Sequence, residues 1–113
     1  MTDPTIVFAP LLDADVRSIA DELRPPHFEF QNVPLEDVPA AIQSADFLCG
    51  FIGPIDTQSL VSAAANRLKL VQLMSVGYDR FNLDGARAAR LPVAVNGGAN
   101  AIAVAEHAIM LML

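Results

Sequence analysis

The sequence predicts an α/β fold, a doubly wound sheet of five parallel strands, from two observations. Short apolar segments alternate with helix-like segments five times along the 113 residues. The segments between them carry no obvious hairpin turns, so successive strands are expected to run parallel and to be joined by right-handed crossovers. A chain of this length is long enough for one domain with its own hydrophobic core.

The first three strands are predicted from apolar and aromatic runs. Residues 5–9 are β-branched and aromatic, and Pro10 ends this strand. Residues 27–33 alternate apolar and polar side chains, which indicates a half-exposed strand at an edge of the sheet. Residues 46–51 form the third strand.

Three helices are predicted between these strands, over residues 13–23, 34–44 and 56–66. Asp13 or Asp15 suits the amino end of the first helix, by capping or by its charge against the helix dipole. Apolar residues at helical spacing should face the core. These residues are Val16, Ile19, Ala20, Leu23, Val38, Ala41, Ile42, Leu60, Val61 and Ala64.

The fourth strand, residues 68–74, is a short apolar run that we expect to be buried on both faces. It leads into Ser75, Val76 and Gly77, at the end of a strand where open α/β sheets bind ligands. Gly77 permits backbone angles that a side chain would forbid, so successive N–H groups can turn toward one point. Such a concavity of amides suits a carboxylate. The alternative is a plain tight turn.

The rest of the chain predicts a short helix over residues 82–90, a strand over residues 92–95 and a helix over residues 101–113. Asn82 and Asn100 are the expected caps of the two helices. The residues of the short helix that should face the core are Leu83, Ala86 and Ala89.

The last helix is apolar nearly all round, and only Glu106 and His107 interrupt it. This pair could relay protons, but a structural role is favoured. An exposed apolar helix marks an interaction surface. We therefore expect the helix to fold back on the domain or to pair with another copy of the chain, which would make a homodimer.

Three strand ends form the predicted cleft: residues 52–53, 75–77 and 96–100. They are small, glycine-bearing and uncharged, which suits a small polar ligand held by backbone amides and Asn side chains. No acid, base or nucleophile converges there, and no metal site is predicted. Ser75 has no obvious base, so a turn residue is favoured over a nucleophile.

Composition and missing motifs exclude several classes of function. The net charge is −6 with no basic run, which argues against nucleic acid and against an anionic membrane surface. Residues 1–4 do not begin a signal peptide and Cys49 is the single cysteine, so cytoplasm is the default expectation. Neither a Gly-x-Gly-x-x-Gly fingerprint nor a P-loop occurs, and residues 10–13, after the first strand, contain no glycine.

Two stretches carry a resemblance to a known family. Residues 68–79 (LKLVQLMSVGYD) and residues 98–107 (GANAIAVAEH), with Pro92 and Val93 between them, resemble the signatures of the NAD-dependent D-2-hydroxyacid dehydrogenases. Their order and spacing match the end of that family's amino-terminal substrate-binding domain. The resemblance is specific over residues 68–113 and only architectural over residues 1–67.

The resemblance implies a flavodoxin-like or Rossmann-like domain of an enzyme that interconverts 2-oxo acids and D-2-hydroxy acids by hydride transfer with NAD or NADP. It implies that the amides of Val76 and Gly77 hold the substrate carboxylate and that Val104 packs near the nicotinamide. The loop after the third strand would close over the substrate. The substrate-binding residues it implies are Ile52, Gly53, Ser75, Val76, Gly77 and Asn100.

The resemblance also implies a division of the chain. Residues 1–99 would be the substrate-binding domain, and residues 100–113 would begin a hinge helix that leads to a cofactor-binding domain. The family's catalytic Arg, acidic residue and His match no residue of this chain, and His107 is not that His. We therefore expect the 113-residue chain alone to be inactive and to lack measurable affinity for NAD.

One departure from the family pattern and one alternative function stay open. Residues 95–97 (VNG) stand where the commonest family form has Asn-Thr-Pro, which should loosen the cleft wall and alter the range of substrates. The alternative to the enzyme is a free-standing flavodoxin-like module that binds a small anion or a protein partner without catalysis.

Overall fold

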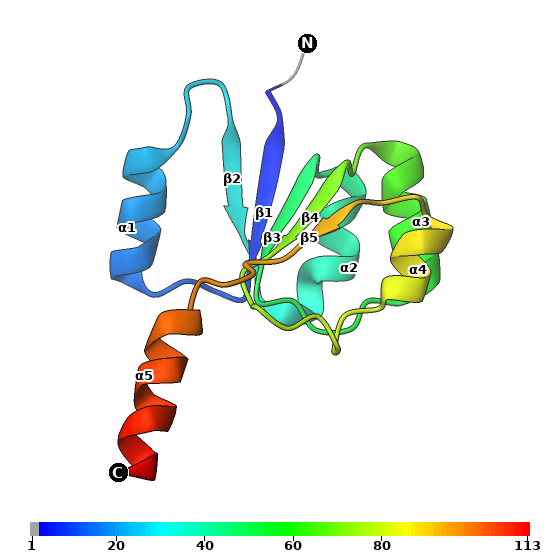
Figure 1. Ribbon diagram of the computed structural model, residues 1–113. Coiled ribbons are helices and arrows are strands. Elements are labelled where there is room, and N and C mark those ends of the chain that lie inside the picture. The colour runs from blue at the N-terminus through cyan, green and yellow to red at the C-terminus, as the bar shows by residue number, and fades with distance from the viewer. Residues whose placement is uncertain (1–2) are drawn as a thin grey trace.

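β-branched and apolar runs form the sheet at the positions that the sequence predicts. The protein is described here by a computed structural model that covers residues 3–113, and these residues contain five strands (Figure 1). All four strand pairings are parallel, and the strand order is β2-β1-β3-β4-β5. The bounds are β1 Thr5–Ala9, β2 Glu29–Asn32, β3 Phe47–Gly50, β4 Leu70–Leu73 and β5 Val93–Ala94. The predicted parallel α/β fold is confirmed, with β2 at an edge.

The helices follow the predicted order with one break. They are α1 Ala14–Leu23, α2 Val38–Ala41, α3 Thr57–Asn66, α4 Leu83–Ala88 and α5 Ala101–Met112. The single helix predicted over residues 34–44 is wrong: α2 is one short turn between 3-10 segments at Leu35–Asp37 and Ile42–Ser44. Pro39 explains the break, because a residue without an N–H group fits only the first turn of an α-helix.

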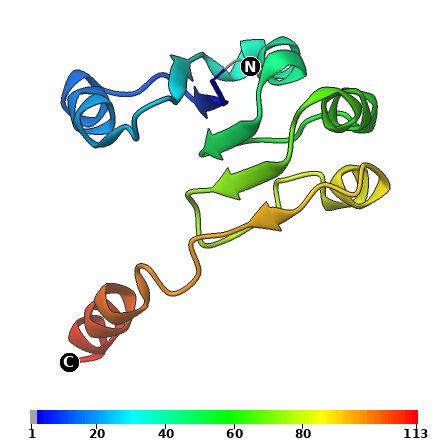
Figure 2. The ribbon, with the colours of Figure 1, turned by 90° about the horizontal axis from the view of Figure 1, so that it is seen from above.

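The helices divide unequally between the two faces of the sheet. Figure 2 shows α2, α3 and α4 along one side of the strands and α1 on the other, while α5 extends away from the sheet. The sheet is therefore doubly wound, as the sequence predicts, but only one of its faces carries a layer of three helices.

The core lies between the sheet and the three-helix layer. Val7, Leu48 and Val71 are neighbours across β1, β3 and β4, and each is 0% exposed. Alternation along the strands places these side chains on one face. The helix residues buried against them are Val38, Ile42, Leu60, Ala63 and Ala86.

Several of the core predictions are wrong. In α1 the apolar residues Val16, Ile19 and Leu23 are 48%, 55% and 73% exposed, because no element within residues 3–113 covers that side of the helix. In α3 Ala63 is buried in place of Val61. The fourth strand is buried on one face only, since its alternate residues are only partly buried.

A buried carboxylate fastens the amino ends of the central strands. Asp46 accepts a hydrogen bond from the Thr5 N–H at 2.9 Å and pairs with Arg67 at 2.7 Å and with Lys69 at 3.5 Å. Burial raises the pKa of Asp46, but the hydrogen bonds and the two cations outweigh it and hold the pKa below its ordinary value. The Asp46 cluster therefore lies at the amino ends of the strands, opposite to their carboxyl ends.

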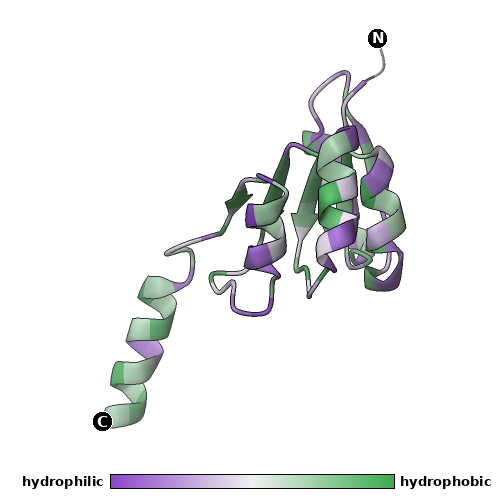
Figure 3. Cartoon of the chain, turned by 90° about the vertical axis from the view of Figure 1, so that its right-hand side faces the viewer, coloured by the Kyte–Doolittle hydropathy of each residue, from purple (hydrophilic) through white to green (hydrophobic). Residues whose placement is uncertain are grey.

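The last helix, α5, does not fold back on the domain. None of its residues is buried, and Figure 3 shows a mostly hydrophobic ribbon that projects from the sheet. Asn100 occupies the N-cap position but its side chain makes no capping hydrogen bond. Of the two arrangements predicted for this helix, folding back is therefore wrong within the described chain. No helix in residues 3–113 is both long enough and apolar enough to span a membrane.

Candidate functional site

The end of β3 is shaped by a glycine that no other residue could replace. Gly50 has φ +143°, and a Cβ built on it would lie 1.8 Å from the carbonyl oxygen of Ala9. The next residue, Phe51, donates its N–H to the same oxygen at 3.1 Å. The close approach of β1 and β3 fixes the start of the loop that contains Ile52 and Gly53.

The loop after β4 is anchored at both ends. At its start the Met74 N–H donates to the Gly50 carbonyl at 2.9 Å, and at its end Phe81 is buried and donates its N–H to the Tyr78 carbonyl at 3.1 Å. Between these anchors the Ser75 hydroxyl donates to the Gly77 carbonyl at 2.7 Å. This bond gives Ser75 the role of a turn residue.

Two N–H groups in the middle of this loop have no partner in the described residues. Within residues 3–113, neither the Val76 N–H nor the Gly77 N–H donates a hydrogen bond to any protein group. The prediction that the turn uses the special backbone angles of a glycine at Gly77 is wrong, because the glycines with positive φ within residues 3–113 are Gly50 and Gly98. A larger residue at Gly77 would be crowded by a neighbouring side chain, because a Cβ there would lie 3.2 Å from Oδ1 of Asp79.

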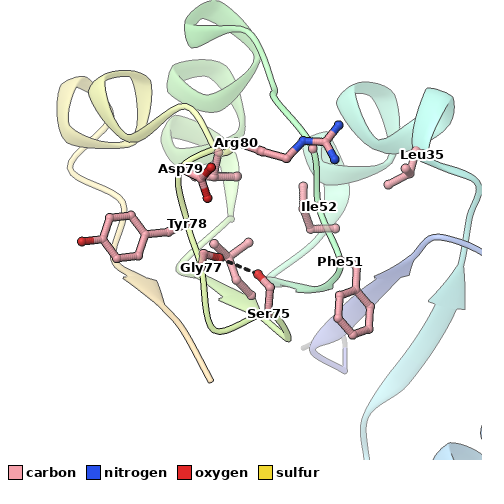
Figure 4. Close-up of a pocket in the computed structure, with 11 residues that line it drawn as sticks. Leu35, Phe51, Ile52, Ser75, Gly77, Tyr78, Asp79 and Arg80 are labelled. Atoms are coloured by element: carbon pink, nitrogen blue, oxygen red, sulfur yellow. Dashed lines mark hydrogen bonds between the residues drawn. The ribbon is translucent and has the colours of Figure 1, made fainter. Parts of the chain in front are cut away.

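The two loops enclose a pocket of about 290 Å³ at the carboxyl ends of β3 and β4 (Figure 4). Four of the residues predicted for the site line it: Ile52, Gly53, Ser75 and Gly77. Sequence reasoning did not assign the other lining residues to the site. They are Leu35, Phe51, Leu73, Tyr78, Asp79, Arg80 and Phe81. Six of the seven lie within four residues of the predicted loops, whereas nothing in the sequence indicates Leu35, which comes from the 3-10 turn before α2.

Three predicted site residues do not line this pocket: Val76, Asn100 and Val104. Val76 lies on the loop itself, with its side chain 39% exposed. Asn100 and Val104 belong to the projecting α5 segment, and both are exposed. At the third predicted strand end, Asn96 contacts the loop after β4, because its N–H donates to the Ser75 carbonyl at 3.0 Å.

The pocket wall is mainly apolar, with two charges at its border. Figure 4 shows Asp79 near Gly77 and the Arg80 side chain reaching past Ile52 toward Leu35. Asp79 and Arg80 form no ion pair with each other or with any other group in the described residues. The same residues contain no cluster of His, Cys, Asp and Glu that could hold a metal ion.

The chain is thus an α/β domain whose pocket lies at the carboxyl edge of a parallel sheet, where open α/β sheets bind ligands. Residues 5–110 match the family described as "D-isomer specific 2-hydroxyacid dehydrogenase, catalytic domain". The chain therefore belongs to the D-isomer specific 2-hydroxyacid dehydrogenase family, and the resemblance drawn from the sequence is confirmed. A comparison with curated protein sequences gives no significant match.

Solved structures share the fold. The pyruvate reductase of Chlamydomonas reinhardtii aligns with a TM-score of 0.67 and 20% identity, over 98% of this chain and 34% of that one. D-lactate dehydrogenase from Escherichia coli gives 0.63 and 22%, over 96% and 36%. NAD-dependent formate dehydrogenase from Staphylococcus aureus, in complex with NAD, gives 0.63 and 21%, over 94% and 34%. The chain spans about a third of the length of these proteins.

The turn after β1 does not fit the pyrophosphate of a dinucleotide. In a site of that kind a glycine-rich turn after the first strand lets the backbone approach the pyrophosphate. Here the turn after β1 runs through Pro10, Leu11, Leu12 and Asp13 and contains no glycine. The free Val76 and Gly77 N–H groups can donate hydrogen bonds to a ligand at this edge of the sheet.

Proposed function

We propose that this domain holds the substrate of an oxidoreductase that interconverts 2-oxo acids and D-2-hydroxy acids by hydride transfer with NAD or NADP. The observation that carries the proposal is the pair of free N–H groups at Val76 and Gly77, at the carboxyl end of β4. Membership of the family supports it. The nicotinamide cofactor is proposed to bind outside residues 1–99, with Val104 beside it and residues 100–113 as the start of the hinge helix.

The role proposed for these amides is to orient the substrate carboxylate. Backbone N–H groups fixed by a strand end carry no negative charge and need little reordering when an anion binds. Ile52 and Gly53, on the facing loop, would cover the bound substrate, and Asn100 would face it. The Asp79 carboxylate near Gly77 opposes an incoming anion, so two amides should give the chain alone only millimolar affinity.

A titration of the isotopically labelled chain with pyruvate tests the proposal. We expect the amide signals of Val76 and Gly77 to shift with a Kd in the millimolar range, and pyruvamide, which lacks the carboxylate, to leave them unchanged. Equal shifts with pyruvate, acetate and sulfate would favour the free-standing anion-binding module. No shift with any of these ligands would contradict both readings.

Gly53→Val provides a variant that fills the pocket without disturbing the fold. A Cβ at Gly53 meets no atom within 4 Å, so the branched side chain should extend into the space that the substrate needs. We expect pyruvate binding to weaken about fivefold or more, a loss of roughly 1 kcal/mol. Gly97→Val is the matched control, because a Cβ there also meets nothing within 4 Å and Gly97 does not line the pocket.

A further inference from the structure

Arg80 lies in the wall between two neighbouring pockets. It lines the pocket described above and also a second one of about 400 Å³, formed with the turn before α2 and the loop after β3. Figure 4 shows its guanidinium group over Ile52 and directed toward Leu35. Both of those residues line the two pockets as well. A charge on Arg80 is therefore within reach of a ligand that extends from one pocket into the other.

This guanidinium group has no partner in the described part of the chain. The ion pairs of residues 3–113 use Arg67, Lys69 and Arg87, and Arg80 donates no hydrogen bond to any described group. It is also the only basic side chain among the described residues that line the two pockets. The acidic side chains there, Asp79 and Glu36, are not within ion-pair distance of it.

We propose that Arg80 binds a second anionic group at the far end of the substrate. The proposal rests on the proposed function, in which the first carboxylate lies at the Val76 and Gly77 amides. Ile52, Leu73 and Phe81 line the same pocket with apolar side chains that suit the carbon atoms between two anionic groups. A guanidinium group recognises a carboxylate or a phosphate through two parallel hydrogen bonds. The substrate class is therefore a 2-oxo acid with a distal carboxylate or phosphate.

The preference for such substrates should be moderate. Arg80 is exposed, so water already solvates its charge and a ligand without a distal anion leaves no buried charge unpaired. Discrimination then comes only from the added attraction. We expect about a three- to tenfold preference for the doubly anionic ligand at low salt, and a smaller preference at high salt.

Two matched pairs of ligands test this subsite on the labelled chain. 2-Oxoglutarate and 2-oxopentanoate share a five-carbon 2-oxo acid skeleton and differ in the distal carboxylate. 3-Phosphohydroxypyruvate and hydroxypyruvate form the second pair, which differs by a phosphate and separates the two possible anions. The doubly anionic member of at least one pair should bind more tightly and shift the Arg80 side-chain signal.

Arg80→Gln should abolish this preference, because it should weaken the binding of the doubly anionic ligand more than that of 2-oxopentanoate. Arg24→Gln is the matched control, because Arg24 follows α1 and does not line either pocket, yet its loss changes the net charge equally. Equal affinity within both pairs, or a preference that persists in Arg80→Gln, would overturn the subsite and leave the proposed function standing. Failure of every ligand to shift the Val76 and Gly77 amides would instead overturn the proposed function, and the subsite with it.

Discussion

The two faces of the sheet are built from the same strands but differ in how they are covered. On one face Val7, Leu48 and Val71 form a row that is fully buried under α2, α3 and α4. On the opposite face Phe8 and Cys49 continue a parallel row that is only half-buried, although Phe8 also packs edge-on against Phe30 with ring centroids 5.0 Å apart.

This difference shows what the apolar side of a helix predicts and what it does not predict. The spacing of apolar residues predicts which side of a helix faces away from solvent, and it does so equally for α1 and α3. Which element packs against that side is known only from the folded structure. In α3 Leu60 is 0% exposed, whereas Ile19 of α1, which was also predicted to face the core, is 55% exposed. Most of the free energy of unfolding should therefore come from the covered face of the sheet. The site lies at the carboxyl ends of β3 and β4.

The largest expected effect is the contrast between Leu48→Ala and Ile19→Ala. Leu48 is fully buried, so its truncation should lower the free energy of unfolding by about 2–5 kcal/mol through lost burial and a residual cavity. Ile19 is mostly exposed, and its truncation should cost less than about 0.5 kcal/mol. Urea unfolding of the two variants measures both values. Similar losses would mean that α1 is packed against a partner in solution.

The second effect concerns the amino edge of the covered face. Asp46→Asn removes the charge that Arg67 and Lys69 neutralise, and should cost about 2–3 kcal/mol at pH 7, since Asp46 is buried but its partners are partly exposed. Asp84→Asn is the control, because the Asp84–Arg87 pair is exposed and should contribute less than about 0.5 kcal/mol.

The pH dependence of the Asp46 effect has a fixed sign. Because the folded pKa lies below its ordinary value of 3.8, ionised Asp46 stabilises the fold above about pH 4. That stability is lost as the pH falls through the folded pKa. The difference in unfolding free energy between the wild type and Asp46→Asn should therefore shrink between pH 6 and pH 3. A difference that grows on acidification would contradict this assignment.

Sequence patterns predicted the parts of the site that depend on the backbone. Strand ends and small residues placed Ile52 and Gly53 in the same pocket as Ser75 and Gly77, because parallel strands bring their carboxyl ends to one edge. The pattern could not tell which glycine is conformationally required. That position is Gly50, whose constraint comes from Ala9 in a different strand.

The side-chain wall of the site was less accessible to prediction. Arg80 lies in the loop after β4, but the direction of its side chain depends on the turn between Gly77 and the buried Phe81. Leu35 reaches the pocket because Pro39 interrupts the predicted helix and leaves a 3-10 turn before it. Both placements depend on local turns of the backbone, which the periodicity of apolar residues does not report.

The removal of α5 should cause the smallest change in the free energy of unfolding. None of the α5 side chains is buried, so a chain ending at Ala99 should retain its free energy of unfolding to within about 0.5 kcal/mol at low protein concentration. Its association state should change instead. Ile102, Ile109 and Leu111 are 76%, 60% and 72% exposed, and burying each could contribute about 1.5–3 kcal/mol to the pairing of two copies.

Light scattering of the two chains distinguishes the possible roles of α5. We expect the 113-residue chain to form a dimer whose mass falls to that of a monomer on dilution, and the chain ending at Ala99 to be monomeric throughout. A monomeric full chain with unchanged stability would exclude self-association through α5. A truncated chain that loses several kcal/mol would mean that this helix covers the open face of the sheet in solution. The contrast between the two faces would then apply only to the arrangement in Figure 2.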